Sequence, residues 1–123
     1  MATRQEVNEF LSDFKAALTL GHTRWLKRSA KGKEHLAGLG ITRDRAMAYL
    51  QGLKTEDYSE GPSPDDFEPA SDVWTFGAMV DKTEAYIKVT LRPDPRKRTV
   101  THAVIWSFHA AEYRIKYPLR ESP

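Results

Sequence analysis

The sequence predicts an α+β fold in which N-terminal helices pack on one face of a C-terminal antiparallel β-sheet. Two patterns predict it: apolar residues recur every three or four positions in the first half and alternate with polar residues in the second. The chain has 123 residues, of which 40% are hydrophobic, enough for one core and too few for two catalytic domains. We expect a single domain with a helical half over 1–55, an acidic, proline-rich loop over 56–72 and an antiparallel meander over 73–119.

The first predicted helix is an amphipathic segment that ends near Gly21. Its apolar residues recur at helical spacing and line the side that packs on the rest of the chain: Val7, Phe10, Leu11, Phe14 and Leu18. The segment that follows, Thr23 to Arg28, has two interpretations, a short strand or a basic connection around Trp25.

Two more helices are predicted before residue 55. A short one contains His35, Leu36 and Leu39 and stops at Gly38 or Gly40. Thr42 then has the position of an N-cap, since a threonine directly before an apolar periodic segment accepts a hydrogen bond from the first helical turn. The inward-facing residues of this third helix are Ala46, Met47, Leu50 and Leu53.

Strands are predicted after the loop. Residues 59–72 hold three prolines and five acidic residues, with little to bury, which favours a loop. Two strands joined by a turn at Asp81 and Lys82 follow, because apolar residues occupy every second position: Trp74, Phe76, Ala78 and Val80 in the first, then Ala85, Ile87, Val89 and Leu91 in the second.

The third strand, within Val100 to His109, can pair with the second in two registers. A tight turn centred on Pro95 and Arg96 would set His102 against Val89 and bury an imidazole in the core, which is costly. Sliding the pairing by four residues gives every core residue an apolar partner: Leu91 with Val104, Val89 with Trp106 and Ile87 with Phe108. We choose this register, which places Trp106 in the core beside Trp74.

The chosen register gathers polar groups on the opposite face. Tyr86 then faces His109, Lys88 faces Ser107, and residues 93–102 protrude as a basic loop. The face carries Tyr86, Lys88, Arg92 and His109, and the loop carries Arg96, Lys97, Arg98 and His102. Cations that position phosphates, with an imidazole that transfers protons near neutral pH, suit a single-stranded RNA substrate. The alternative interpretation is that these residues have no functional role, and only form cross-strand pairs and keep a hairpin loop soluble.

Charge is sorted along the chain: the net charge is +5 over residues 1–55, −8 over 56–84 and +5 over 85–123. If the flanking segments converge, they offer a basic surface to a polyanion, although solvated helix faces and loops would give the same pattern. The chain has no cysteine, no Gly-rich phosphate loop and no apolar segment long enough for a membrane span. Its first ten residues lack the basic-then-apolar order of a signal peptide. We expect a cytoplasmic protein without a metal or other cofactor.

Several short motifs resemble the MqsR group of bacterial type II toxins. They are Leu53, Asp57-Tyr58, Gly61-Pro62, Val73-Trp74-x-Phe76-Gly77, Tyr86-Ile87-Lys88-Val89, Ser107-Phe108-His109 and Tyr117-Pro118-Leu119. The resemblance implies a RelE-like fold, metal-independent cleavage of mRNA, either on the ribosome or without it, and inhibition by a cognate antitoxin. It places catalytic roles on Tyr86, Lys88 and His109, where the last replaces the family's lysine, and an RNA-binding role on Thr75, which replaces a glutamine.

Two alternatives use the same surface without catalysis. One is a non-catalytic RNA-binding module, which would bind RNA in a salt-dependent way without cutting it. The other is a small interaction protein that receives a peptide on its open sheet face or along an edge strand.

Overall fold

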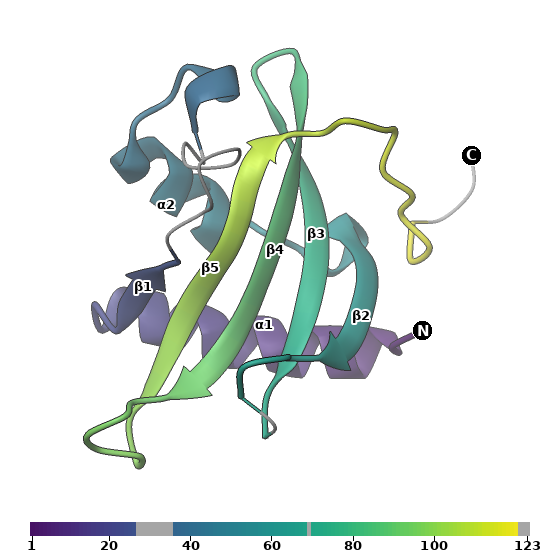
Figure 1. Cartoon of the computed structure of the whole chain (residues 1–123). Coiled ribbons are helices and arrows are strands. Elements are labelled where there is room, and N and C mark those ends of the chain that lie inside the picture. Colours follow the sequence, from purple (N-terminus) through teal and green to yellow (C-terminus); the bar gives the residue numbers. More distant parts are fainter. Residues whose placement is uncertain (27–35, 69, 121–123) are drawn as a thin grey trace.

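Two α-helices cover one face of a five-stranded mixed sheet, so the fold is α+β as predicted (Figure 1). The computed structural model describes residues 1–26, 36–68 and 70–120. In chain order, the elements are α1 (Arg4–Thr19), β1 (Thr23–Trp25), a 3₁₀ turn (Ala37–Leu39), α2 (Arg43–Gln51), a 3₁₀ turn (Thr55–Asp57), β2 (Tyr58–Pro64), β3 (Asp72–Val80), β4 (Thr83–Pro93) and β5 (Thr101–Ala110). No helix in the described ranges is both long and apolar enough to cross a membrane.

A threonine caps the N-terminus of each α-helix, and the predicted N-cap at Thr42 is confirmed. The backbone N–H of Thr3 donates to the Glu6 carboxylate at 2.9 Å, and the Glu6 backbone N–H donates back to the Thr3 hydroxyl at 3.1 Å, which forms a capping box before α1. The Thr42 hydroxyl accepts from the Arg45 backbone N–H at 3.2 Å and caps α2. The predicted short helix is only the turn over Ala37–Leu39, and the part of that prediction that rests on His35 lies outside the described residues.

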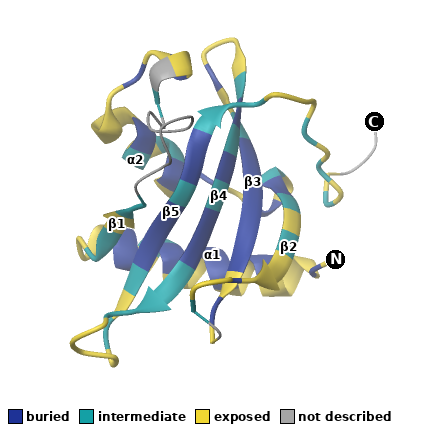
Figure 2. Cartoon of the chain, in the orientation of Figure 1, coloured by how far each residue is buried: buried dark blue, intermediate teal, exposed yellow. Residues whose placement is uncertain are grey.

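The core lies between the helices and the sheet. Phe10 of α1 stacks on Trp74 of β3 with ring centroids 4.7 Å apart, and Phe14 and Phe76 are fully buried beside them. Figure 2 shows the buried residues running along β3, β4 and β5 and along the side of α1 that faces them. The predicted core positions of the first helix and of Trp74 are therefore confirmed.

The sheet has the strand order β1-β5-β4-β3-β2, and β1 runs parallel to β5. Residues Thr23 to Trp25 thus form a strand, while Arg28 lies outside the described residues. The expectation of a purely antiparallel sheet was wrong, because a three-residue strand is too short to show alternation in the sequence. This pairing gives backbone groups along the outer edge of β5 hydrogen-bond partners. For example, the Leu26 N–H donates to the Ile105 carbonyl at 3.0 Å.

The predicted loop over 56–72 contains the edge strand β2, which pairs antiparallel with β3. An edge strand tolerates its prolines because one of its sides has no ladder to complete. Gly61 has a φ of 112°, and a side chain there would bring a Cβ within 2.7 Å of the Val73 carbonyl oxygen. The proline-rich composition therefore marks an irregular edge strand and not a loop.

The pairing of β4 with β5 follows the chosen register in one half and departs from it in the other. Tyr86 pairs with His109, Ile87 with Phe108 and Lys88 with Ser107, as predicted. A bulge then shifts the pairing by one residue, so that Val89 pairs with Ile105 and Leu91 with Ala103. The register of β4 with β5 passes over Trp106 at this bulge. The predicted loop over 93–102 is shorter than expected, because Pro93 belongs to β4 and His102 lies in β5 opposite Arg92.

We call the sheet face away from the helices the polar face. Alternation along β4 puts Tyr86, Lys88 and Arg92 on it, and pairing adds Ser107 and His109 from β5. Thr75 of β3 joins them because it pairs with Lys88. This face carries all three predicted catalytic residues, together with Thr75 and Arg92, whereas Arg96, Lys97 and Arg98 lie in the loop after β4.

The C-terminal residues 111–120, here called the strap, form no strand, although the predicted meander extended to residue 119. Figure 1 shows the strap leaving the end of β5 and passing toward β2. Glu84 holds it: one carboxylate oxygen accepts from the Tyr117 hydroxyl at 2.7 Å and the other from the Ile115 backbone N–H at 3.1 Å. Burial, together with the nearby Glu84, raises the pKa of Tyr117 above its ordinary value. Arg120 bonds to the Glu56 carbonyl at 3.0 Å, and Arg4 donates to the Leu119 carbonyl.

We predict that Gly77→Ala dislodges the strap, because a Cβ at Gly77 would lie 2.2 Å from the Tyr117 hydroxyl oxygen and 2.8 Å from its ring. Trypsin should then cut after Arg114 and Lys116 several times faster, while the urea midpoint falls by an amount that corresponds to about 1–3 kcal/mol. Gly52→Ala is the matched control, since the nearest atom to its Cβ is 3.4 Å away. Equal cleavage rates in the two variants would contradict the predicted contact.

Candidate functional site

Two cross-strand rows define the site on the polar face. Thr75, Lys88 and Ser107 lie opposite one another on β3, β4 and β5. The next row places Gly77 beside Tyr86 and His109. Because directly paired residues share a face, the alternation of β4 brings the predicted catalytic side chains Tyr86, Lys88 and His109 to neighbouring positions.

Tyr86 and His109 form a stacked pair, with ring centroids 5.3 Å apart and planes inclined by 21°. The His109 Nδ1 atom lies 2.8 Å from the Ala110 carbonyl oxygen. A carbonyl oxygen only accepts hydrogen bonds, so Nδ1 carries the hydrogen in this contact. In the neutral ring the Nε2 atom is then the acceptor, which is the protonation state a general base requires.

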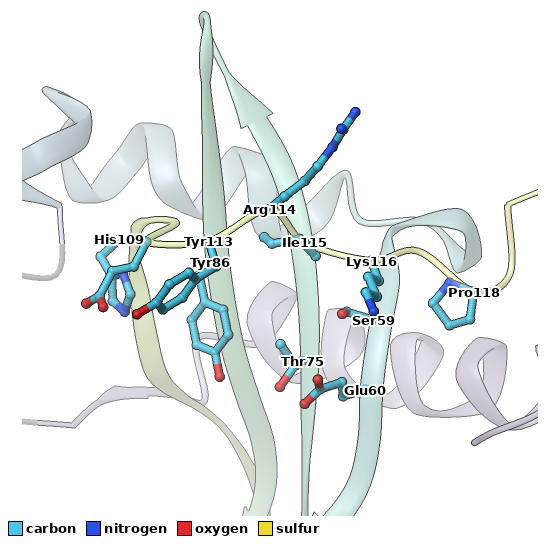
Figure 3. Close-up of a pocket in the computed structure, with 11 residues that line it drawn as sticks. Ser59, Glu60, Thr75, Tyr86, His109, Tyr113, Arg114, Ile115, Lys116 and Pro118 are labelled. Carbon is cyan, nitrogen blue, oxygen red and sulfur yellow. The ribbon is translucent and has the colours of Figure 1, made fainter.

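A cleft of about 660 Å³ opens beside this pair, between the sheet and the strap (Figure 3). Its lining comes from β2, β3, β4, β5 and the strap: Ser59, Glu60, Thr75, Tyr86, His109, Glu112, Tyr113, Arg114, Ile115, Lys116 and Pro118. Figure 3 shows the Lys116 side chain extending toward Ser59, whereas Arg114 points away from the cleft. Thr75 is the one predicted RNA-binding residue that lines it.

The formal charges of this lining balance: the carboxylates Glu60 and Glu112 are matched by Arg114 and Lys116. Lys88 stands beside the cleft on the same face and adds one positive charge. Sequence reasoning missed the four charged residues of the lining. Glu60 lies in the segment that was predicted to be a loop. Glu112, Arg114 and Lys116 lie in the strap, which has neither helical nor strand periodicity and so could not be placed from the sequence.

Lys88 contacts Trp106 instead of the cleft. Its Nζ atom lies 4.7 Å from the centroid of the Trp106 ring, and the Arg92 guanidinium carbon lies 5.4 Å from the same ring. The predicted core position of Trp106 was wrong, because the bulge turns this side chain to the polar face. The indole therefore holds the ammonium group of a residue two positions along β4 from Tyr86, and the Cα atoms of these two residues are about 7 Å apart.

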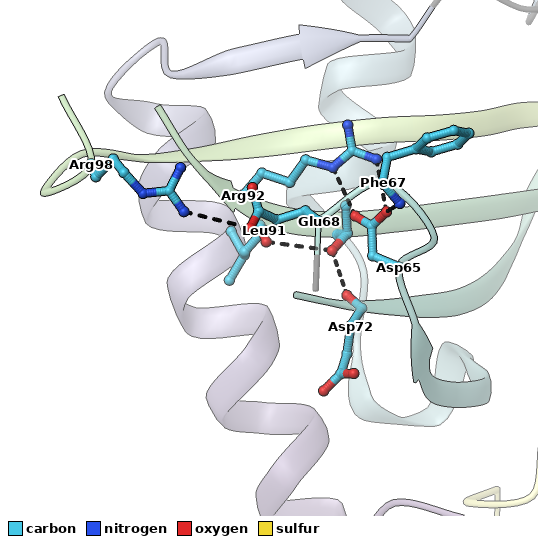
Figure 4. A network of polar contacts seen from close by, with 8 residues as sticks. Asp65, Phe67, Glu68, Asp72, Leu91, Arg92 and Arg98 are labelled. Atoms are coloured by element: carbon cyan, nitrogen blue, oxygen red, sulfur yellow. Dashed lines mark hydrogen bonds and ion pairs between the residues drawn. The ribbon is translucent and has the colours of Figure 1, made fainter. Parts of the chain in front are cut away.

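Arg92, predicted to bind RNA, is occupied by a buried ion pair (Figure 4). Its Nε and a terminal nitrogen bond the two Asp65 carboxylate oxygens at 2.7 and 3.0 Å, and the two side chains are only 11% and 0% exposed. Burial alone would raise the pKa of Asp65, but hydrogen bonds from Arg92 and from the Phe67 backbone outweigh it and lower that pKa from 3.8. Arg92 therefore anchors the 65–68 segment, and with its side chain only 11% exposed it offers little surface to a phosphate.

The basic loop after β4 lies at the other end of the sheet (Figure 1). From Tyr86 to Pro93, β4 spans seven residues, so the loop begins more than about 20 Å from Tyr86. Asp94 organises it, accepting from the backbone N–H groups of Arg96 and Lys97 at 2.7 and 2.9 Å, and these bonds lower the pKa of Asp94. The structure thus does not bring Arg96, Lys97 and Arg98 to the Tyr86–His109 pair.

His102 and Arg98 also make contacts of their own at this end. The His102 Nε2 atom lies 2.8 Å from the Asp94 carboxylate, and its ring stacks on His22 at 5.8 Å. Arg98 lies 3.5 Å from Glu68. The predicted RNA-binding set is therefore divided between the two ends of the polar face.

Comparison with family models, with curated proteins and with solved structures gives no match to this chain.

We predict that Asp65→Asn destabilises the protein by about 2–4 kcal/mol, because it leaves the Arg92 guanidinium buried without its counter-charge. The pKa of Asp65 is lowered by folding, so the stabilisation is fully present above pH 3.8 and is lost as the pH falls through the lower folded-state value. Urea titrations from pH 7 to pH 2 would measure both effects. Glu56→Gln, at the exposed Arg4–Glu56 pair, is the control and should change little. A wild-type-like midpoint for Asp65→Asn would show that the pair contributes nothing.

Proposed function

We propose that this protein is a metal-independent endoribonuclease that cleaves single-stranded RNA in the cleft beside Tyr86 and His109. The observation that carries the proposal is the stacked Tyr86–His109 pair, with its rings 5.3 Å apart at the wall of the cleft. Lys88 lies on the same face, in the neighbouring cross-strand row. Cleavage of RNA through its own 2′-hydroxyl needs a proton acceptor, a proton donor and a fixed positive charge, and these three side chains supply them.

Each side chain then has a defined part in the reaction. The His109 Nε2 atom removes the proton from the 2′-hydroxyl, and the 2′-oxygen forms a bond to the adjacent phosphorus. The Lys88 ammonium, held against Trp106, stabilises the negative charge that develops on the phosphoryl oxygens. The bond from phosphorus to the 5′-oxygen breaks, and that oxygen takes a proton from the Tyr86 hydroxyl. The products are a 2′,3′-cyclic phosphate and a 5′-hydroxyl.

The biological role that we propose is that of a type II toxin, which cuts mRNA and so stops translation and growth. Two features support it: the MqsR-like motifs, and a sheet covered by helices on one face with Tyr86, Lys88 and His109 on the other, which suits a RelE-like fold. A cognate antitoxin would then keep the protein inactive in the cytoplasm. Assays with naked mRNA and with translating ribosomes, run in parallel, would show which substrate the nuclease uses.

We predict that the purified protein cuts single-stranded RNA in the presence of a chelator and leaves cyclic-phosphate ends. His109→Ala should lower the rate by about 10²–10⁴-fold, since it removes the general base. Lys88→Ala should lower it by about 10²-fold or more, since it removes the charge that faces the transition state. Denaturing gels and mass spectrometry of the fragments would measure both effects.

Lys82→Ala is the matched control, because Lys82 lies exposed in the turn between β3 and β4. Induced expression in a bacterium should arrest growth for the wild type and for Lys82→Ala but not for the two site variants. Wild-type cleavage rates in folded His109→Ala and Lys88→Ala proteins would remove the proposed site. Salt-dependent RNA binding without any product would indicate a binding module instead of a nuclease.

A further inference from the structure

The aromatic residues show an uneven pattern of exposure. The chain has three tryptophans, five tyrosines and five phenylalanines, and all of them lie in the described residues. Only two are exposed, Tyr113 at 84% and Phe67 at 74%. Both lie along the polar face, one toward each end of the part of β4 that carries Tyr86 and Lys88. Exposed aromatic rings offer flat surfaces on which the rings of a ligand can stack.

Tyr113 belongs to the strap and lines the cleft together with Tyr86 and His109. Figure 3 shows Tyr113 and Tyr86 on the same side of the cleft. Because Glu84 holds the strap at Ile115 and Tyr117, the exposed ring of Tyr113 is carried by an anchored segment.

Phe67 lies at the other end and is also held in place. Its backbone N–H donates to the Asp65 carboxylate at 2.9 Å, and Asp65 is itself fixed by Arg92 (Figure 4). The Phe67 ring lies 5.7 Å from the Trp106 ring, which in turn carries Lys88. The Phe67 ring therefore packs on the Trp106 ring and remains exposed to solvent.

The formal charges of the side chains around Phe67 sum to −1. Asp65 is matched by Arg92, and Glu68 lies 3.5 Å from Arg98, while Asp66 is exposed beside them. Such a surface attracts a base through stacking, and Lys88 and Lys116 are left to attract the phosphates.

We propose that Tyr113 and Phe67 are two stacking platforms for unpaired bases, and that a single-stranded segment of RNA lies between them along β4 and β5. The inference rests on the proposed function and specifies how that substrate is held. From Tyr86 to Arg92 the strand spans about 20 Å, the length of roughly six stacked nucleotides and of fewer unstacked ones. A duplex would keep its bases inside the helix, so the site selects single strands.

The test uses a ten-nucleotide RNA with 2′-O-methyl groups, which binds but cannot be cleaved through the 2′-oxygen. Fluorescence anisotropy in chelator should show that Phe67→Ala and Tyr113→Ala each weaken binding by about tenfold. Phe67→Tyr should bind like the wild type, whereas Phe67→Leu should bind like Phe67→Ala, because leucine is apolar but has no ring to stack. Leu20→Ala, at a 68% exposed position on α1's end, is the control.

A second measurement identifies the base. Single bases are removed from the RNA, one position at a time. At the position that stacks on Phe67, removal of the base should weaken binding to the wild type but should not weaken binding to Phe67→Ala any further. The platforms would be overturned, whatever the cleavage assay shows, by wild-type affinity for RNA in three variants: Phe67→Ala, Tyr113→Ala and Phe67→Leu. Base-dependent binding without cleavage of unmodified RNA would instead support the platforms and overturn the nuclease. Absence of RNA binding by the wild type would overturn both.

Discussion

The pairing of β4 with β5 is the constraint on which the rest of the structure depends. Its first half sets Tyr86 against His109 and Lys88 against Ser107, so one register decides which polar groups meet. Its second half is displaced by a bulge that turns Trp106 out of the core. That displaced indole supports both Lys88 and Phe67, and a regular ladder would have buried it under the helices.

The polar face is framed by two segments that have little secondary structure. The strap covers one end through Tyr117 on Gly77, and residues 65–68 cover the other through the Asp65–Arg92 pair. Arginine suits the second task because its planar fork binds a carboxylate with two hydrogen bonds. One of the chain's best phosphate-binding groups is thus used to build the surface, and the groups left to contact a ligand lie between the two covers.

Sequence reasoning located the helices, the β3–β4 hairpin and the Tyr86–His109 pair, because each depends on periodicity or on which apolar residues can pair. It failed where geometry is set by single residues. The alternation of apolar and polar residues cannot show a bulge, so Trp106 was assigned to the core. The prolines of β2 indicated a loop, although an edge strand tolerates proline. The cleft could not be predicted from the sequence, because one of its walls is the strap, and the position of the strap depends on hydrogen bonds of Glu84, Arg4 and Arg120.

The position of that wall in the chain separates the cleft from the sheet. The last described strand ends at Ala110, and the residues that close the cleft, 112–118, follow it and take no part in strand pairing. Substitutions within 112–118 can therefore reshape one wall of the cleft while the hydrogen-bonded ladders of the sheet stay intact.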